Sequence, residues 1–473
     1  MSRIKDLGSN ILYVMIGNAG AKLLSLLMLP FYTRWLSVEQ YGIIDMLGVY
    51  STLLMGFVSC CIYDSIFVFP KQATKEKQQE YYTSGVVFSF LSILFFLIVS
   101  IVIHFVSDIY NIYNSFCDYI YYIFAILVFT FCQTYTQEFC RSIGAMKVYS
   151  SSGIVLAALM VVSSFILVPK YHIEGYVSSV IISNILTLLY SVIFSRSYTY
   201  FRINKFCRCA LMEMLKYSVP LIPNAVMWWV VGASNRPIME QYVGIYAIGI
   251  FAVAGKFPNL INSFLTMFTK AWQISVLDEY KKEGFGVFFY KVIFSFSFIL
   301  GIVCIIVGFC SFPLVKLFTG EEFIDAWHFI PLLCAANLLS CVSSLVGVLF
   351  SALKNSKYYF YSSVCAALTA VVSNFILIPI LGLYGASLSV VLSFGAMFAV
   401  RIYYGNIYFK VKNKFHFIEL IIVPLMILFI IPTGLFIWYK IAIILFLIVC
   451  HFLMNVQMLK DFYCLITEIS ISR

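Results

Sequence analysis

The sequence predicts an all-α integral membrane protein with about fourteen transmembrane helices. Two observations lead to this fold class. First, 62% of the residues are hydrophobic and only 11% are charged, and second, the apolar residues form long continuous runs. A bilayer core of ~30 Å requires roughly 20 apolar residues per helix. Because lipid offers no partner to backbone N–H and C=O groups, runs of this length must be helical. The alternation typical of a membrane β-barrel is missing.

Most of the expected spans form two sets of six, followed by a final pair. The first set is near 10–34, 42–69, 83–107, 119–143, 149–168 and 175–195. After a basic linker, the second set is near 214–236, 242–266, 287–311, 328–352, 358–379 and 383–405, and the final pair is near 417–439 and 441–464. The loops between them are short, so the function must take place within or across the membrane.

The distribution of lysine and arginine supports this arrangement. When the loops are numbered in order, 24 basic residues fall on one side and five on the other, and Lys22 and Lys256 lie within spans, which accounts for all 31. Cytoplasmic loops carry the excess of basic residues, so both termini are expected in the cytoplasm. Basic residues spread over many loops beside anionic lipid do not form a nucleic-acid patch, despite the net charge of +10.

The 14 cysteines are scattered through the apolar runs. Cysteines in such surroundings usually act as small buried hydrophobic residues. Cys207 and Cys209 are close together in the basic linker, but no further ligands follow at zinc-site spacing. We therefore expect no metal site, no disulfide framework and no cofactor.

Two segments of the chain match without gaps at a constant offset of 210 residues. The matched pairs include Lys147 with Lys357, Tyr149 with Tyr359, Ser152 with Ser362, Pro169 with Pro379 and Gly175 with Gly385. An even number of spans separates the two segments, so both enter the membrane in the same direction, as in a parallel repeat. We predict an N-terminal six-helix lobe at 1–205, a C-terminal six-helix lobe at 206–412 and two additional helices in 413–473, with a cavity between the lobes.

Polar side chains within the predicted spans are candidate functional residues, because a charge at the bilayer centre costs at least ~2.5 kcal/mol. The candidates for the cavity are Lys22, Arg34, Asn224, Arg236, Lys256 and Asn259, and the acidic residues in the spans include Asp64 and Glu138. Structural roles are the alternative. Arg34 and Arg236 could extend to the outer headgroups, and Glu138 could form a local pair with Arg141, three residues further on.

Two stretches of the chain resemble a known family. Residues 10–42, which include Pro30-Phe-Tyr-Thr-Arg34, are similar to the N-terminal signature of the polysaccharide-transport flippases. These are the O-antigen and capsule repeat-unit translocases of the MATE-like MOP superfamily. Residues 215–246 resemble the start of their second lobe, and Trp272 also fits. The sequence departs from the pattern at Asn235, where the resemblance implies an acidic residue before Arg236.

The resemblance implies a bacterial inner-membrane flippase that moves undecaprenyl-diphosphate-linked oligosaccharides by alternating access. Lys22, Lys256 and Arg236 would bind the diphosphate, while asparagine and tyrosine side chains would bind sugar hydroxyls. Asp64 and Glu138 are the candidates for ion coupling, because the sequence has no G-x-x-x-x-G-K-[ST] motif for ATP. The expected partners are the lipid-linked oligosaccharide, membrane lipids and other polysaccharide-assembly proteins, but no nucleic acid.

Two other functions stay open. A MATE-like drug or metabolite antiporter would share the fold but would favour an acid-rich cavity, whereas these spans hold both lysines and acids. A membrane-embedded polysaccharide polymerase would need a large outward loop, and the longest one, near 312–327, is too short for a domain. The sequence has no H-E-x-x-H or G-x-S-x-G motif, so we do not expect an enzyme.

Overall fold

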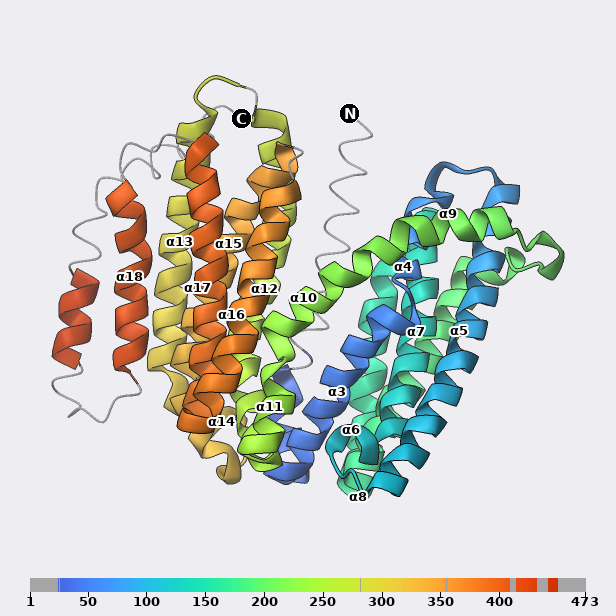
Figure 1. The fold of residues 1–473 in the computed structure, drawn as a ribbon, viewed down its shortest axis with the longest axis horizontal. Helices are drawn as coiled ribbons and strands as arrows, with labels where there is room; N and C mark the ends of the chain where they lie inside the picture. The colour runs from blue at the N-terminus through green and yellow to red at the C-terminus, as the bar shows by residue number, and fades with distance from the viewer. Residues whose placement is uncertain are drawn as a thin grey trace. The chain divides into compact units, whose positions relative to one another are not determined.

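The computed structural model describes residues 24–449 apart from 25, 281, 354–355, 409–413 and 432–440. This described part consists of α-helices joined by short 3₁₀ helices and turns (Figure 1). Eight of its helices are long and apolar enough to cross a membrane. The predicted all-α membrane fold is therefore confirmed. The number of spans stays a prediction, since most of the first expected span and parts of the last two lie outside the described residues.

The chain divides into two compact units, Met1–Trp229 with Gly244–Gly249, and Val230–Val243 with Ile250–Arg473. The predicted lobe boundaries at 205 and 412 stay predictions. The described helices that begin in the first unit are α2 (Leu29–Trp35), α3 (Val38–Val58), α4 (Ile62–Val68), α5 (Lys75–Tyr110), α6 (Ser115–Asp118), α7 (Ile120–Ser142), α8 (Met146–Ser195), α9 (Arg208–Ser218), α10 (Ile222–Ala233) and α12 (Ile245–Glu279). Helix α7 packs against α8, α4 and α3.

The second unit is organised around one buried helix. Its helices are α11 (Asn235–Tyr242), the rest of α12, α13 (Phe285–Phe309), α14 (Ser311–Phe318), α15 (Ile330–Ala352), α16 (Ser356–Leu381), α17 (Leu383–Tyr408) and α18 (Lys414–Ile430). Helix α15 is almost completely buried and packs against α13, α17 and α18, while α16 packs along α17. A helix covered on all sides can be apolar around its whole circumference, as α15 nearly is.

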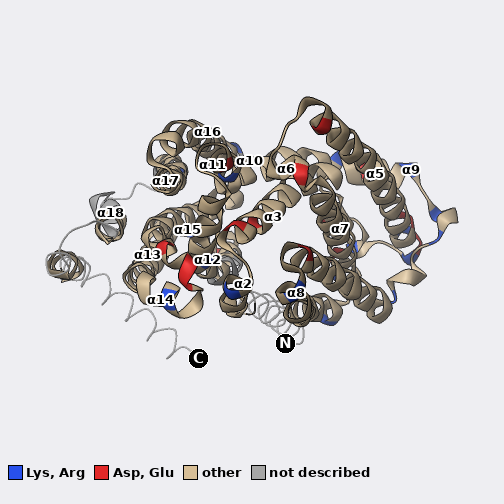
Figure 2. Cartoon of the chain, turned by 90° about the horizontal axis from the view of Figure 1, so that it is seen from below, with Lys and Arg blue, Asp and Glu red and all other residues tan. Residues whose placement is uncertain are grey.

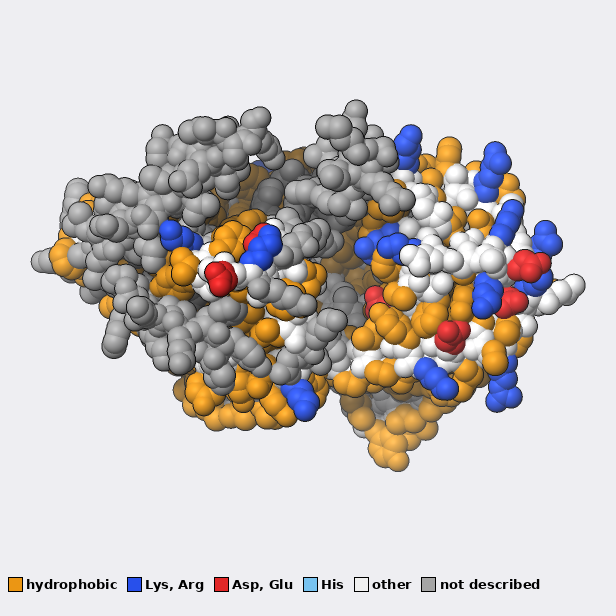
Figure 3. Space-filling model, turned by 90° about the horizontal axis from the view of Figure 1, so that it is seen from above, with side chains coloured by type: hydrophobic (Ala, Val, Ile, Leu, Met, Phe, Trp, Pro, Cys, Tyr) orange, Lys and Arg blue, Asp and Glu red, His pale blue; other side chains and the backbone are white. Residues whose placement is uncertain are grey.

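Basic side chains gather at one end of the first unit. The exposed members are Lys71, Lys75, Lys77, Arg196, Arg202, Arg208 and Lys216, from the connection between α4 and α5 and from the linker around α9. Figure 3 shows this basic face. The view from the opposite end shows acidic side chains on α3 and near α6 (Figure 2). The loop analysis predicts that all seven of these residues lie on the cytoplasmic side.

The two matched segments fold into helices with the same bend. Helix α8 contains Pro169 and is interrupted at His172, whose φ is 48°. At the offset of 210, α16 contains Pro379 and the chain bends at Gly382, whose φ is 56°. Helices α7 and α15 precede these segments at the same offset and have 23 residues each.

A close backbone contact follows each bend. A Cβ atom on Gly175 would collide with the carbonyl group of Leu167, and a Cβ atom on Gly385 would collide with the carbonyl group of Leu377. In both segments the serine four residues later donates a hydrogen bond from its hydroxyl to the glycine carbonyl, at 2.7 Å and 2.8 Å. The glycine that matched in the sequence is thus required for the same reason in both copies.

Several predicted span boundaries differ from the structure. The predicted span 42–69 is divided into α3 and α4 at Cys60 and Cys61, which both have left-handed φ values, 45° and 52°. Left-handed φ is rare outside glycine, asparagine and aspartate, so these cysteines gave no signal for a break. The predicted span 214–236 is divided among α9, a 3₁₀ turn, α10 and α11. The predicted spans 149–168 and 175–195, by contrast, lie on either side of the interruption of α8 at His172.

Candidate functional site

Two of the predicted cavity residues lie in the first unit, and Lys22 lies outside the described residues. Arg34 is exposed in the last turn of α2, and Asn224 is exposed in the first turn of α10. Nearby, the indole of Trp229 on α10 donates a hydrogen bond to the carbonyl of Val49 on α3 at 2.9 Å. This bond fixes the part of α10 that carries Asn224 to the first unit.

Arg236, in the second unit, is half-buried at the start of α11. Its guanidinium lies over the ring of Phe251 at 5.0 Å. Its Nη1 donates hydrogen bonds to the carbonyl of Gly232 at 2.7 Å and to the amide oxygen of Asn235 at 2.9 Å. Asn235 is buried and neutral, so this contact orients the arginine without cancelling its charge. The departure from the family pattern at Asn235 therefore leaves this contact without a negative charge.

Lys256 and Asn259 lie on α12 in the same unit as Arg236. Lys256 is half-buried, and Asn259, less than one turn further along, is exposed. The amide nitrogen of Asn259 lies 3.9 Å from the position of a Cβ atom on Gly255. Pro258 lies between the two residues, and α12 continues through it.

The two candidates for ion coupling lie in one cluster of the first unit, which α4, α7 and α8 form. Arg141 on α7 lies 3.3 Å from the Glu138 carboxylate, and its positive charge also acts on Asp64 of α4. The guanidinium stacks over Phe67 at 3.9 Å and lies 5.5 Å from the ring of Tyr149 on α8. The local pair between Glu138 and Arg141 is confirmed, and the structure adds Asp64 to it.

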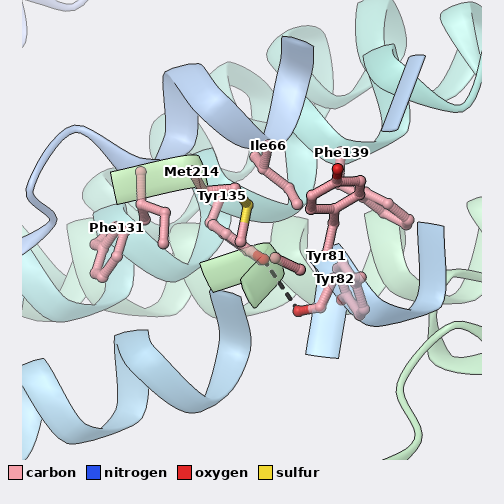
Figure 4. Packing of buried hydrophobic residues seen from close by; sticks show 9 residues of the cluster. Ile66, Tyr81, Tyr82, Phe131, Tyr135, Phe139 and Met214 are labelled. Atoms are coloured by element: carbon pink, nitrogen blue, oxygen red, sulfur yellow. Dashed lines mark hydrogen bonds between the residues drawn. The ribbon is translucent and has the colours of Figure 1, made fainter. Parts of the chain in front are cut away.

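An aromatic core supports this cluster from the adjacent turns of α4 and α7. Figure 4 shows its members, which come from α4, α5, α7 and α9: Ile66, Tyr81, Tyr82, Phe131, Tyr135, Phe139 and Met214. The Tyr135 hydroxyl donates a hydrogen bond to the carbonyl of Tyr82 at 3.1 Å. Because Ile66 and Phe139 are next in sequence to Phe67 and Glu138, this packing holds the cluster in place.

The loop analysis missed one charged residue inside the second unit. Arg401 was counted among the basic residues of a cytoplasmic loop, but the structure buries it completely in α17. It donates hydrogen bonds to the hydroxyl of Ser362 at 3.0 Å and to the carbonyl of Ser343 at 2.7 Å, and it lies over the ring of Tyr359 at 4.4 Å. Tyr359 and Ser362 were noted only as members of the repeat.

The part of the chain that the structure describes contains no group of three or more His, Cys, Asp or Glu side chains that could hold a metal ion. The charged and polar candidates described above are cations, carboxylates and neutral polar groups on apolar helices. Such groups bind or pass charged solutes through a membrane.

The fold defines the class of protein. It is similar to the lipid II flippase MurJ in an inward closed conformation, with a TM-score of 0.71, 15% identity and coverage of 96% of this chain and 99% of that chain. It is also similar to an inward-facing multidrug resistance MATE family transporter of the MOP superfamily, with a TM-score of 0.63, 13% identity and coverage of 85% and 96%. These relatives are transporters, and the chain has their multi-pass membrane fold.

The sequence identifies the family within this class. Residues 7–273, more than half of the chain, match the model of the polysaccharide biosynthesis protein family. The chain therefore belongs to the polysaccharide biosynthesis proteins, as the resemblance of its first 42 residues indicated. The comparison with curated proteins found no match.

Proposed function

We propose that this protein is a flippase that moves undecaprenyl-diphosphate-linked oligosaccharides across the bacterial inner membrane by alternating access. Membership of the polysaccharide biosynthesis family and the likeness in fold to a lipid II flippase support this proposal. A diphosphate and its glycan cannot cross hydrocarbon unaided, because burying unpaired charges and hydroxyls is costly. The polyprenyl tail can stay in lipid throughout. The protein needs to shield only the head group.

The observation that carries the proposal is the cationic pair Arg236 and Lys256, which are half-buried on α11 and α12. Arg236 donates hydrogen bonds to two neutral acceptors, the carbonyl of Gly232 and the amide oxygen of Asn235. Arginine is suited to bidentate phosphate contacts. In our proposal Lys22 and Arg34 add positive charge to the same cavity, while Asn224 and Asn259 bind sugar hydroxyls.

Ion coupling is assigned in the proposal to Asp64 and Glu138. Both carboxylates interact with Arg141 at the contact of α4 and α7. Protonation of either acid would weaken its attraction to the arginine, and movement of α4 relative to α7 would follow. The driving force is then an ion gradient.

The test of the proposal is a deletion strain examined for lipid-linked repeat units. We expect these units to accumulate on the cytoplasmic face, out of reach of a periplasmic glycosidase, and surface glycan to be lost. Re-expression of the chain should restore both. Normal surface glycan in the deletion strain, in the absence of a second flippase gene, would overturn the proposal.

The role of the cationic pair is tested with Lys256→Arg and Lys256→Gln. The arginine variant keeps the charge, so we expect partial glycan export, whereas the glutamine variant should lose most of it although it inserts normally. Likewise, Lys22→Arg should keep partial glycan export and Lys22→Gln should lose most of it. Lys316, an exposed lysine on α14 in the predicted outward loop near 312–327, provides the control, because Lys316→Gln should export normally. Full export by Lys256→Gln would show that the lysine does not contact the substrate.

The proposed orientation has both termini in the cytoplasm. A C-terminal fusion should be active with a cytoplasmic reporter and silent with a periplasmic one. The reverse result would contradict the assignment of every loop.

A MATE-like antiporter of drugs or metabolites is the second candidate, because the cluster at Arg141 contains two acids and the fold is also similar to MATE transporters. This function predicts that the deletion strain becomes sensitive to cationic drugs while its glycan stays intact. The glycan assay and a drug-sensitivity assay on the same strain separate the two functions.

A further inference from the structure

Arg401 is a fully buried cation whose described partners are all neutral. Its Nε donates to the hydroxyl of Ser362 and its Nη1 donates to the carbonyl of Ser343. The Tyr359 ring lies beneath the guanidinium at 4.4 Å. None of the ion pairs formed by described residues includes Arg401. Among the described residues, this positive charge between α15, α16 and α17 is therefore paired with no carboxylate.

Two hydrogen-bond donors at this place have no acceptor. Arg401 Nη2 and Ser343 Oγ are both buried, and no hydrogen-bond partner for either exists among the described residues. The same two residues are already joined by the hydrogen bond of 2.7 Å from Arg401 Nη1 to the Ser343 carbonyl. Buried donors are almost always satisfied, because leaving one unpaired is costly. The same small region therefore combines an unbalanced charge with unused donors.

The charge cannot be removed by deprotonation. The guanidinium keeps its proton under all physiological conditions, unlike a lysine, whose pKa falls readily on burial. A buried ion without a counter-charge strongly destabilises a protein. The described side chains in contact with Arg401 are neutral, so an anion from solution would supply the counter-charge that they lack.

The packing limits the size of that anion. Arg401, Ser343 and Ser362 are each 0% exposed. A Cβ atom on Gly347 would lie 2.9 Å from Arg401 Nη1 and 3.1 Å from the Tyr359 ring, so glycine is needed for the guanidinium to fit between the helices. Such complete burial favours a small anion over the phosphate of a lipid head group or of the substrate.

We propose that Arg401 Nη2 and Ser343 Oγ bind a small monovalent anion of the size of chloride within the second unit. The anion accepts hydrogen bonds from both donors and balances the guanidinium. Its role is to stabilise the packing of α15, α16 and α17, which does not depend on what the protein transports.

The test measures the thermal stability of the purified full-length protein at constant ionic strength, with sodium chloride replaced by sodium gluconate. A ligand that binds only the folded state raises the melting temperature with its concentration until the site is full. We expect a saturable rise of about 2 °C or more between low and high chloride. Bromide should act similarly, and gluconate, which is too large, should not.

Three variants locate the effect. Ser343→Ala removes only one donor and should weaken the chloride response at least several-fold in concentration, and Arg401→Gln should abolish it. Ser191→Ala is the matched control, because Ser191 occupies the position of Arg401 in the first copy of the repeat. Its hydroxyl is likewise buried and has no hydrogen-bond partner among the described residues. Its response to chloride should equal that of the parent.

The outcome is decisive even if Arg401→Gln fails to fold, because Ser343→Ala then carries the test. A parent protein equally stable in chloride and gluconate would overturn the proposal and indicate that the donors are satisfied by neutral molecules such as water. An equal chloride response in the parent and in Ser343→Ala would overturn it as well.

Discussion

The two copies of the repeated segment hold a guanidinium over the same tyrosine but supply it from different helices. In the first copy, Arg141 on α7 lies over Tyr149, remains half-exposed and is paired with Glu138. In the second copy, Arg401 on α17 lies over Tyr359, is completely buried and has neutral partners. The position of Glu138 is occupied in the second copy by Val348, at the offset of 210.

The two copies thus share the same backbone bend although their charged residues differ. The first copy carries acids whose charge can change with pH, whereas the second carries a fixed positive charge. The first is therefore suited to sense protons and the second is not. The bend in each copy lies beside glycine and proline positions that both copies share.

The largest expected effect concerns that shared bend. Gly175→Ala and Gly385→Ala each place a methyl group against a backbone carbonyl that cannot move aside. We expect a loss of about 3 kcal/mol in the free energy of unfolding for each, measured by denaturation in detergent.

Gly48→Ala on α3 is the control, because a Cβ atom there would have no neighbour within 4 Å. It should change stability little. If only one of the two bend variants is destabilised, the two bends are not equivalent and the comparison between the copies fails.

A smaller effect is expected from the tyrosines. Tyr359→Leu removes the ring beneath a buried guanidinium, and a desolvated cation–π contact contributes about 2 kcal/mol. Tyr149→Leu should cost roughly half as much or less, because Arg141 is half-exposed and keeps its closer contact with Phe67 at 3.9 Å. Thermal unfolding of the two variants side by side measures the difference. Equal losses would show that burial of the arginine does not strengthen the contact.

The acid in the first copy should matter for transport more than for stability. Glu138→Gln removes the charge that faces Arg141 and should reduce the rate of glycan export about tenfold, which corresponds to ~1.4 kcal/mol. Glu174→Gln is the control, since Glu174 is exposed on α8 and lies near Tyr122. Export at the parental rate by Glu138→Gln would mean that the pair with Arg141 only stabilises α7.

The smallest effect is expected at the bend residue itself. Gly382 has a φ of 56°, and its nearest neighbour lies 3.9 Å from a Cβ position, so Gly382→Ala meets backbone strain and no collision. We expect a loss of about 1 kcal/mol in the free energy of unfolding. The first copy already carries a non-glycine residue, His172, at this position. A loss as large as that of Gly385→Ala would show a second constraint at the bend.

The sequence predicted the parts of the fold that depend on residue types with special backbone properties. The gap between the predicted spans 149–168 and 175–195 contains the bend at His172, and the gap between the predicted spans 358–379 and 383–405 contains the bend at Gly382. The spacing of three between Glu138 and Arg141 predicted their ion pair. Long apolar runs predicted the helices, since lipid leaves the backbone no other way to be satisfied.

Other features depend on tertiary contacts and were not predictable. Arg401 was assigned to a loop because a charge near the end of an apolar run usually marks the water boundary. Only the packing of Gly347 and Tyr359 against it shows that it is inside. The break at Cys60 and Cys61 was missed because neither residue type favours left-handed φ. Asp64 on α4 and Arg141 on α7 are far apart in the sequence, so no helical spacing could predict that they interact.

The break at Cys60 and Cys61 has a mechanical consequence. Helix α4 is a separate rigid piece of seven residues that carries Asp64, and the chain on its α3 side is joined by two residues in left-handed conformation. A local hydrogen bond from the Cys61 N–H to the Ser59 hydroxyl, at 3.1 Å, replaces part of the helical ladder at this point. A change of charge at Asp64 can therefore reorient the short helix α4 about the break at Cys60 and Cys61, and α3 does not have to rotate with it.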